Sequence, residues 1–272
     1  LDNISIRFEY EPYNKEIVPE NIPLDIVFED DNVIVVNKPD NMVVHPSYGH
    51  YKGTLVHALL YKYKDLKTDD NNQRPGLVHR LDKNTTGLMV VARNEYSLTH
   101  LSSQFSSRTI QRKYIALVWG DIKDDSGKIV GNIGRNKKNR KLMTVLSESN
   151  EGKHAVTHYQ VLERFRYVTL VLCQLETGRT HQIRVHMKYL GHPLFNDNEY
   201  GGNKILRGTT FSKYKQFVQN CFKILPRQAL HAKSLSFIHP KNDKEVSFDV
   251  PLPNDMETVI NRWRKYVFNQ FG

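Results

Sequence analysis

Segments with strand-forming patterns come in adjacent pairs along this chain. Three pairs lie at residues 25–39, 155–177 and 231–251, and in each a short polar turn separates two runs rich in β-branched and aromatic residues. Strands joined by so short a turn pair antiparallel, whereas a parallel pair needs a crossover of roughly a dozen residues or more. The order of the segments therefore predicts an α+β fold built on a mixed, largely antiparallel sheet with flanking helices.

Helical periodicity appears between these pairs. Leu98, Leu101 and Phe105 recur at helical spacing after Asn94, a residue type that caps helices. Further helices are predicted after Thr54, over residues 180–190 up to Gly191, and after Asn254. Single buried strands are predicted at residues 88–92 and 112–120.

Composition places the chain among soluble globular proteins. Its 272 residues are 39% hydrophobic and 25% charged, and this length is ample for a substantial core. The longest apolar runs fall far short of the roughly 20 residues of a membrane helix, and no secretory signal opens the chain. We therefore expect a cytoplasmic protein that does not associate with membranes.

Several kinds of site lack support in the sequence. No glycine-rich dinucleotide motif and no P-loop motif occurs. The twelve histidines show no metal-ligand spacing, and Cys173 and Cys221 lie far apart without a C-x-x-C pattern. The sequence thus favours reduced thiols and a chemistry without metal.

The net charge of +10 and the pI of about 9.4 point to a polyanionic partner. Neutralising phosphates with Lys and Arg releases counterions, which dominates non-specific binding to nucleic acids. A basic pI by itself also occurs in proteins with no such partner. The stretch 135–141 concentrates the charge, with five basic residues in seven positions, and we interpret it as an exposed loop. Such a loop can grip a phosphate backbone or can be a solvated turn.

One carboxylate stands out in the stretch GLVHRLDKNTTGLMVVARN, residues 76–94. Asp82 follows a basic residue and precedes a polar turn of Asn, Thr and Gly, which leads into a buried strand. An Asp before such a turn commonly bonds its own backbone two residues on, which is a structural role. The same position would also present a reactive carboxylate at the edge of the sheet, and the local sequence leaves both interpretations open.

The stretch ETGRTHQIRVHMKYLGHP, residues 176–193, enters one of the predicted helices. The spacing predicts a buried stripe of Ile183, Met187 and Leu190. Another face carries His181, Arg184 and Lys188. An arginine on such a face is commonly just solvated, but Arg179, Arg184 and the helix N-terminus together would make an anion site.

Five stretches of the chain form a recognisable set. They are NKPDNMVVHP (37–46), HRLDKNTTGLMVVAR (79–93), RKYIALVWG (112–120), TGRTHQIRVHM (177–187) and RQALHAKSLSFIHP (227–240). Together they closely resemble the RluA family of pseudouridine synthases, in the family's order and from about Val18 to near the C-terminus. The combination of H-R-L-D-x-x-[ST]-[ST]-G-L with T-G-R-x-H-Q-[IL]-R is very specific. Within the family the chain is similar to the RluD type, whose members modify large-subunit ribosomal RNA.

The resemblance implies a pseudouridine synthase fold with a central basic cleft, and an enzyme that isomerises specific uridines of RNA without a cofactor. Asp82 matches the catalytic aspartate of the family, which attacks the uridine or the sugar freed from it, a role that suits a carboxylate. Arg184 matches the arginine that pairs with this aspartate. Tyr114, which alone would be interpreted as a half-buried sheet aromatic, matches the active-site tyrosine.

Further residues are implied to contact RNA or to line the cleft: Arg80, His45, Lys38, Arg179, His181 and Thr86. Arg80 corresponds to an arginine that fills the gap left by a flipped-out base. Members of this type carry an S4 RNA-binding domain ahead of the catalytic domain, and alternation over residues 5–10 predicts a strand. We therefore interpret residues 1–17 as the tail and linker of an S4-like domain. Residues 18–272 are interpreted as the catalytic domain, acting on ribosomal RNA as a monomer.

Two other functions stay open at this point. A binding module, such as an RNA chaperone, would keep the basic surface without needing the Asp, the Arg and the Tyr together. A different base-flipping enzyme is the second alternative. A deaminase needs zinc ligands in H-x-E and P-C-x-x-C patterns, which the sequence lacks. A glycosylase would release free uracil, whereas isomerisation leaves the mass of the RNA unchanged.

Overall fold

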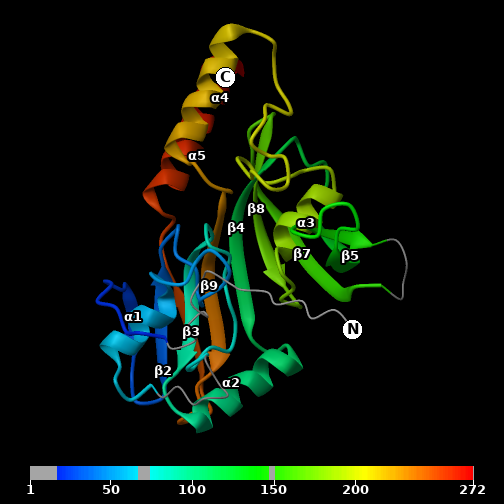
Figure 1. Ribbon diagram of the computed structural model, residues 1–272. Coiled ribbons are helices and arrows are strands. Elements are labelled where there is room, and N and C mark those ends of the chain that lie inside the picture. Colours follow the sequence, from blue (N-terminus) through cyan, green and yellow to red (C-terminus); the bar gives the residue numbers. More distant parts are fainter. Residues whose placement is uncertain (1–16, 67–73, 147–150, 272) are drawn as a thin grey trace, which may run out of the picture.

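The computed structural model of the chain describes residues 17–66, 74–146 and 151–271. Within these residues ten strands form one sheet and five helices pack around it (Figure 1). Of the paired strands, all but one pair are antiparallel. The predicted α+β fold with a mixed, largely antiparallel sheet is confirmed.

The elements have the following bounds. The strands are β1 (Ile26–Glu29), β2 (Val33–Lys38), β3 (Thr86–Ala92), β4 (Gln111–Trp119), β5 (Ser126–Arg135), β6 (Met143–Leu146), β7 (Lys153–Arg164), β8 (Val168–Leu175), β9 (Leu230–Ile238) and β10 (Glu245–Asp249). The helices are α1 (Leu55–Lys62), α2 (Glu95–Ser107), α3 (Gln182–Tyr189), α4 (Ser212–Ile224) and α5 (Asn254–Phe271).

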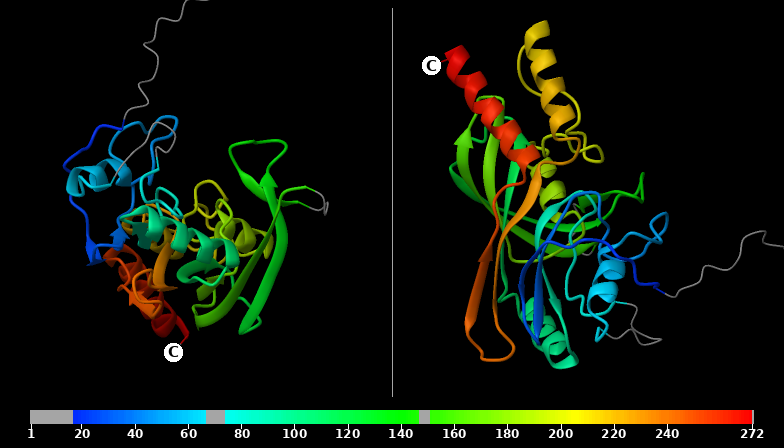
Figure 2. Two further views of the ribbon diagram at one scale, coloured as in Figure 1. Left: turned by 90° about the horizontal axis from the view of Figure 1, so that it is seen from below. Right: turned by 90° about the vertical axis from the view of Figure 1, so that its left-hand side faces the viewer.

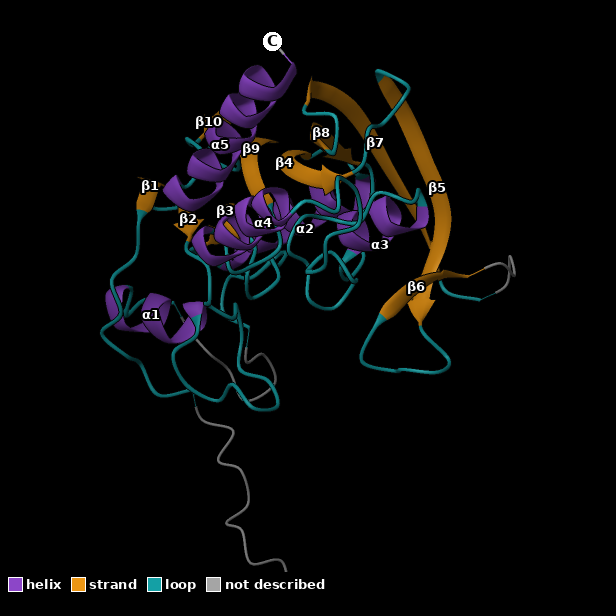
Figure 3. Ribbon diagram, turned by 90° about the horizontal axis from the view of Figure 1, so that it is seen from above, coloured by secondary structure: helices purple, strands orange, loops and turns teal. Residues whose placement is uncertain are grey.

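The strands follow the order β1-β2-β3-β9-β4-β8-β7-β5-β6, with β10 paired to β9. The three predicted pairs are indeed neighbours: β1 with β2, β7 with β8, and β9 with β10. The one parallel pair, β3 with β9, is short and joins Thr86 and Gly87 to His231 and Ala232. Seen from above, α1 lies toward the β2 end of the sheet and α3 lies beside β5 toward the other end (Figure 3).

Strand β4 is buried on both faces and divides the core. Ile115, Leu117 and Trp119 pack with residues of α4 and α5, the two helices that lie side by side at one end of the molecule (Figure 2). Ala116 packs in a second cluster, with residues of α1 and α3. Tyr114 belongs to this second cluster as well. Alternation along the strand therefore places Tyr114 on the side of the sheet where α3 lies.

Two helix boundaries differ from the prediction. The helix expected over residues 180–190 begins only at Gln182, because His181 adopts a left-handed backbone conformation with φ 56° and ends the preceding turn. Asn254 is the first residue of α5 rather than the cap before it. Both differences are of the size expected where a helix end depends on local hydrogen bonding.

Helix α4 and strands β5 and β6 were not among the predicted elements. The buried residues Tyr214, Val218 and Cys221 of α4 recur at helical spacing, so the signal for this helix was present in the sequence. The strand predicted at residues 5–10 lies outside the described residues, and the division of the chain at residue 17 stays a prediction.

The basic stretch 135–141 spans the end of β5 and the connection to β6, and its Lys and Arg residues are exposed, as predicted for a loop. Lys137 contacts Glu151 at 3.1 Å, so part of this charge is matched by an acid. None of the helices that the structure describes is long and apolar enough to cross a membrane.

The parallel contact between β3 and β9 depends on a glycine. Gly87 has φ 111°, and a Cβ at this position would overlap the carbonyl oxygen of Ala232 and lie 2.7 Å from its backbone nitrogen. We predict that Gly87→Ala lowers the free energy of unfolding by about 3 kcal/mol, because strain and overlap add. Gly191→Ala is the matched control, since Gly191 also has positive φ but has open space around it. Its cost should be about 1 kcal/mol. Urea unfolding measures both values, and equal costs would contradict the steric argument.

Candidate active site

A cavity of about 440 Å³ brings together segments that are far apart in the sequence. Its walls are residues 78–85 before β3, residues 105–112 from the end of α2 into β4, Tyr114, and residues 175–184 between β8 and α3. Five arginines line the cavity, against only two carboxylates, those of Asp82 and Glu176. The cavity is therefore a basic cleft.

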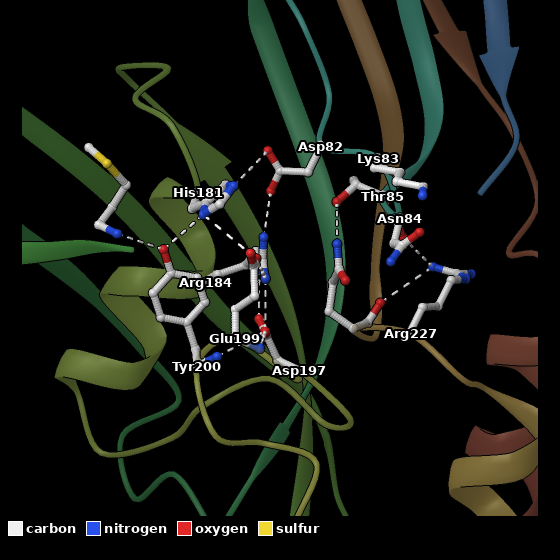
Figure 4. A network of polar contacts seen from close by, with 12 residues as sticks. Asp82, Lys83, Asn84, Thr85, His181, Arg184, Asp197, Glu199, Tyr200 and Arg227 are labelled. Atoms are coloured by element: carbon white, nitrogen blue, oxygen red, sulfur yellow. Dashed lines mark hydrogen bonds and ion pairs between the residues drawn. The ribbon is translucent and has the colours of Figure 1, made fainter. Parts of the chain in front are cut away.

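Asp82 lies in the turn that leads into β3, and side chains from other elements fix this turn (Figure 4). Within the turn, the backbone N–H of Thr85 donates to the Asp82 carbonyl at 3.0 Å. The anchoring bonds run from Lys38 Nζ to the Lys83 carbonyl (3.1 Å), from Arg227 Nη1 to the Asn84 carbonyl (3.2 Å) and from Gln228 Nε2 to Thr85 Oγ1 (3.3 Å). The turn is thus held in place without help from the Asp82 side chain.

The Asp82 carboxylate faces the cavity. Arg184 Nη1 donates to its Oδ2 at 3.2 Å, and His181 Nε2 lies 3.8 Å from Oδ1. No backbone N–H group within the described residues donates to this carboxylate, and its side chain is 19% exposed. The structural interpretation of Asp82, in which it bonds its own turn, is therefore wrong, and the predicted contact with Arg184 is present.

Arg184 is held by three carboxylates. Its Nε and Nη2 donate to both oxygens of Asp197 at 2.7 and 2.8 Å, and Nη2 also donates to Glu199 at 2.5 Å. Although burial opposes the charged form, the hydrogen bonds and charge of Asp197, aided by Asp82 and Glu199, raise the pKa of Arg184 well above its ordinary value. The guanidinium also lies over the Tyr200 ring, 4.8 Å from its centroid. Its position is fixed on every side.

This arrangement differs from the prediction for α3, in which Arg184 lay on a solvated face and formed an anion site with Arg179. Arg184 is only 4% exposed and lies on the buried face of α3, not on a solvated one, while Leu190 lies beyond the helix and is 38% exposed. Since acids of the protein already match its charge, Arg184 does not form the predicted anion site with Arg179. At the helix start, the Gln182 side chain accepts from the Arg179 N–H at 2.9 Å and from the Thr177 hydroxyl at 2.7 Å.

His181 connects Asp82 with residues behind it. Its Nδ1 lies 2.8 Å from the Tyr200 hydroxyl and 4.0 Å from Glu199, while Nε2 points toward Asp82 (Figure 4). A non-glycine residue with positive φ is uncommon, and such strain is often found at functional sites. The left-handed backbone of His181 turns its ring into the cleft.

Tyr114 lies in the cavity wall with 6% of its surface exposed. Burial raises the pKa of its phenol above the ordinary value, the charge of Arg112 opposes that rise, and Asp82 adds to it. The phenol is therefore protonated at neutral pH and can act as a hydrogen-bond donor.

The cavity gathers six of the nine predicted site residues: Asp82, Tyr114, Arg184, Arg80, Arg179 and His181. The other three lie elsewhere. Lys38 is 1% exposed, and its ammonium donates to the carbonyls of Pro39, Met42 and Lys83. Lys38 therefore holds the turn that carries Asp82 and is not exposed to a ligand in the cavity.

Thr86 and His45 also differ from the prediction. Thr86 is 6% exposed, and its hydroxyl lies 2.8 Å from Nδ1 of the buried His231, across the contact between β3 and β9. His45 is half-buried outside the cavity wall, where its Nδ1 lies 2.9 Å from the Pro46 carbonyl. The expectation that these two residues line the cleft is not met.

Several residues of the site were missed by sequence reasoning. Asp197 and Glu199 follow α3 in a polar stretch whose acids carry no motif, and only the structure shows that they bind Arg184. Arg112 was quoted as part of a matching stretch, but its place in the cavity wall was not foreseen. Among the described residues no group of three or more His, Cys, Asp or Glu side chains is placed to hold a metal ion.

Comparison with known proteins identifies relatives of the whole described fold. A family model described as RNA pseudouridylate synthase matches residues 32–189. The chain is 48% identical over 255 residues to the uncharacterized RNA pseudouridine synthase YlyB of Bacillus subtilis, covering 94% of this chain and 78% of that protein. It is 46% identical over 247 residues to ribosomal large subunit pseudouridine synthase D of Vibrio parahaemolyticus, covering 90% and 72%. Among solved structures, human RNA pseudouridylate synthase domain containing 4 superposes with a TM-score of 0.66 at 27% identity, covering 88% of this chain and 93% of that one.

The fold, the basic cleft and these likenesses define an RNA-modifying isomerase. The chain belongs to the RluA-type family of RNA pseudouridylate synthases. Its activity is the conversion of uridine in RNA to pseudouridine.

The position of Arg184 should depend most on its buried partner. We predict that Asp197→Asn lowers the free energy of unfolding by about 3–5 kcal/mol, because it weakens a bidentate ion pair that is closed off from water. Glu199→Gln is the matched control at the same guanidinium, and should cost less than about 1 kcal/mol because Glu199 is 46% exposed. Urea unfolding of both variants gives the comparison. Equal losses would mean that Asp197 does not fix the guanidinium.

Proposed function

We propose that this protein isomerises specific uridines of large-subunit ribosomal RNA, with Asp82 as the nucleophile and without a cofactor. The RNA substrate is supported by relatives that bear the name ribosomal large subunit pseudouridine synthase D. The nucleophile is supported by one observation above all: the Asp82 carboxylate takes no part in its own turn and meets Arg184 at 3.2 Å in a basic cavity.

Pseudouridine formation breaks the N1–C1′ bond of uridine, turns the uracil while it stays bound, and joins C5 to C1′. The C5 proton is lost and N1 gains one, so atoms balance without an oxidant or a reductant. A carboxylate suits this reaction either by attacking the uridine or by bonding to the sugar freed from it. Arg184 orients the carboxylate for that step, and the acids behind Arg184 fix its direction in advance.

Other cavity residues take roles in holding the base. Tyr114 stacks on the uracil in this proposal, which is supported by its position in the cavity wall, and its protonated phenol can donate a hydrogen bond there. Arg80 is exposed at the mouth of the cleft, where it can fill the gap left by the flipped uridine. Arg179 and His181 contact the bound nucleotide from the α3 side. The protein acts on RNA as a monomer in the cytoplasm.

Removing the nucleophile tests this proposal. Asp82→Asn should lower pseudouridine formation by at least about 10⁴-fold, since no second carboxylate of the cavity wall contacts Arg184. RNA binding should change little. Arg184→Lys should also be strongly impaired, because an ammonium cannot reproduce the planar fork. Asp125→Asn, at an acid that is 88% exposed, is the control with the same change of charge.

The measurement is carbodiimide-dependent primer extension on ribosomal RNA from a strain that lacks the protein and is supplied with each variant. Substantial modification by Asp82→Asn would rule out the nucleophile. Mass spectrometry of the RNA excludes or identifies a glycosylase, which would leave abasic sites of lower mass. A binding module would leave uridine unchanged and would therefore give no carbodiimide-dependent stop.

A further inference from the structure

Arg112 differs from the other buried arginines of the structure. Within the described residues three arginines are less than a tenth exposed: Arg112, Arg184 and Arg227. Arg184 meets Asp82, Asp197 and Glu199, and Arg227 donates to both oxygens of Asp255 at 2.8 and 2.9 Å. Within the described residues the Arg112 side chain makes no hydrogen bond or ion pair, and its Nε is sealed from solvent without a partner.

The contacts of Arg112 hold it against the cavity wall without neutralising it. Its guanidinium lies over the Phe105 ring, 5.3 Å from the centroid, and Phe105 stacks in turn on His79 at 4.7 Å. Burial, together with the charge of Arg112, lowers the pKa of His79 to about 3, so His79 is neutral. Glu176, the other carboxylate of the wall, contacts His158 and Lys128 instead. The cation therefore stands beside aromatic faces and forms no ion pair with an acid in the described part of the chain.

A glycine makes room for this arginine. Gly178 has an ordinary φ, so its lack of a side chain is not required by backbone conformation. A Cβ at Gly178 would lie 2.7 Å from Arg112 Nη1. The single glycine of the stretch TGRTHQIRVHM therefore leaves space for the guanidinium. Arg112 is 8% exposed, so it is part of the cavity wall and not a loose surface side chain.

Burying a charge without a partner is costly, and the cost is recovered when a ligand brings the opposite charge. We propose that Arg112 binds a phosphodiester of the RNA strand next to the uridine that occupies the cavity. This inference rests on the proposed function, since it takes the uridine to lie at Tyr114. Arg112 and Tyr114 lie two residues apart on the same face of β4, which separates them by about 7 Å. One nucleotide can therefore place its base at Tyr114 and an adjoining phosphate at Arg112.

A phosphodiester fits Arg112 better than a neutral group of the base does. It carries its charge before any bond of the uridine breaks, so it compensates the buried cation in the bound complex from the start. It also accepts two parallel hydrogen bonds from a guanidinium fork, which gives the contact a direction as well as strength.

Charge removal on both partners tests the contact. A synthetic stem–loop of large-subunit ribosomal RNA that the protein binds carries a candidate uridine, and methylphosphonate replaces one phosphodiester at a time, from two nucleotides before that uridine to two after it. One replacement should weaken equilibrium binding to the native protein by roughly 10- to 100-fold. Arg112→Gln should lose the same amount of affinity for the RNA without methylphosphonate. The one methylphosphonate that weakens binding to the native protein, the critical replacement, should then have no further effect on this variant. Arg112→Lys should fall between the two proteins.

The control for net charge is Arg264→Gln, because Arg264 is 47% exposed on α5 and bound to Glu163. It should keep the sensitivity of the native protein to the critical methylphosphonate. If Arg112→Gln binds as tightly as the native protein, or loses affinity yet keeps that sensitivity, Arg112 does not bind a phosphate. Lower affinity with the sensitivity kept, together with slower conversion of the uridine, would point to a contact of Arg112 with the uracil instead.

Thermal unfolding separates a ligand-binding role from a structural one. Arg112→Gln should unfold at the same temperature as the native protein or higher, since it removes an unmatched buried charge. Arg227→Gln, which breaks the pair with Asp255, should unfold at a clearly lower temperature. An equal drop in both variants would overturn the inference. The binding measurement needs no turnover. If the RNA is bound with this phosphate dependence but is not isomerised, the proposed function is refuted while the role of Arg112 stands.

Discussion

The contact between Asp82 and Arg184 links the two halves of the molecule, and the active site depends on it. Asp82 comes from the turn before β3, and Arg184 comes from α3, 102 residues later. Asp197 takes the Nε and Nη2 edge of the guanidinium, which leaves Nη1 for Asp82. Because a guanidinium is planar and rigid, a partner on one edge fixes the direction of the other. The donor that meets Asp82 is therefore aimed before any substrate arrives.

The turn that carries Asp82 is fixed from the opposite side. Lys38 and Arg227 each donate to a carbonyl of this turn, and Arg227 is itself held by Asp255 at the start of α5. Burial lowers the pKa of Lys38 to about 7, against the pull of Asp82 and Asp40. The ammonium has three donors for its three carbonyl acceptors, whereas a neutral amine has two and would give up one of these bonds. The start of α5 is thus connected to the turn that carries Asp82 through one side chain, that of Arg227.

The sequence predicts those parts of the structure that depend on neighbouring residues. Strand pairs with short turns were predicted and are present, because hairpin pairing is decided locally. The parallel contact of β3 with β9 escapes such reasoning, since it joins residues about 145 positions apart, as in the bond between Thr86 and His231. For the same reason Thr86 was assigned to the cleft when it belongs to a strand contact.

The site shows the same limit. A motif can identify Asp82 and Arg184, but burial of a basic residue depends on acids that the motif does not contain. Helical spacing alone placed Arg184 on a solvated face, and the nearby Asp197 reverses that assignment because it makes burial of the charge tolerable. Lys38 was misplaced for a related reason. Its ammonium is enclosed by the carbonyls of Pro39 and Met42, close to it in sequence, and by the carbonyl of Lys83 in the turn that carries Asp82.

Burial and pairing divide the positive charges of this chain into three kinds. Arg184 and Arg227 are matched by acids, so their charge stabilises the protein and attracts nothing from outside. The exposed stretch 135–141 faces solvent, where salt screens charges beyond about 8–10 Å. It therefore acts on the approach of RNA and should affect the rate of association. Arg112 is buried, so salt screens its charge much less. It acts on an RNA strand that is already in the cleft, and it therefore lengthens the lifetime of the complex. Net charge alone cannot distinguish these roles, whereas burial and the presence or absence of an acidic partner together do.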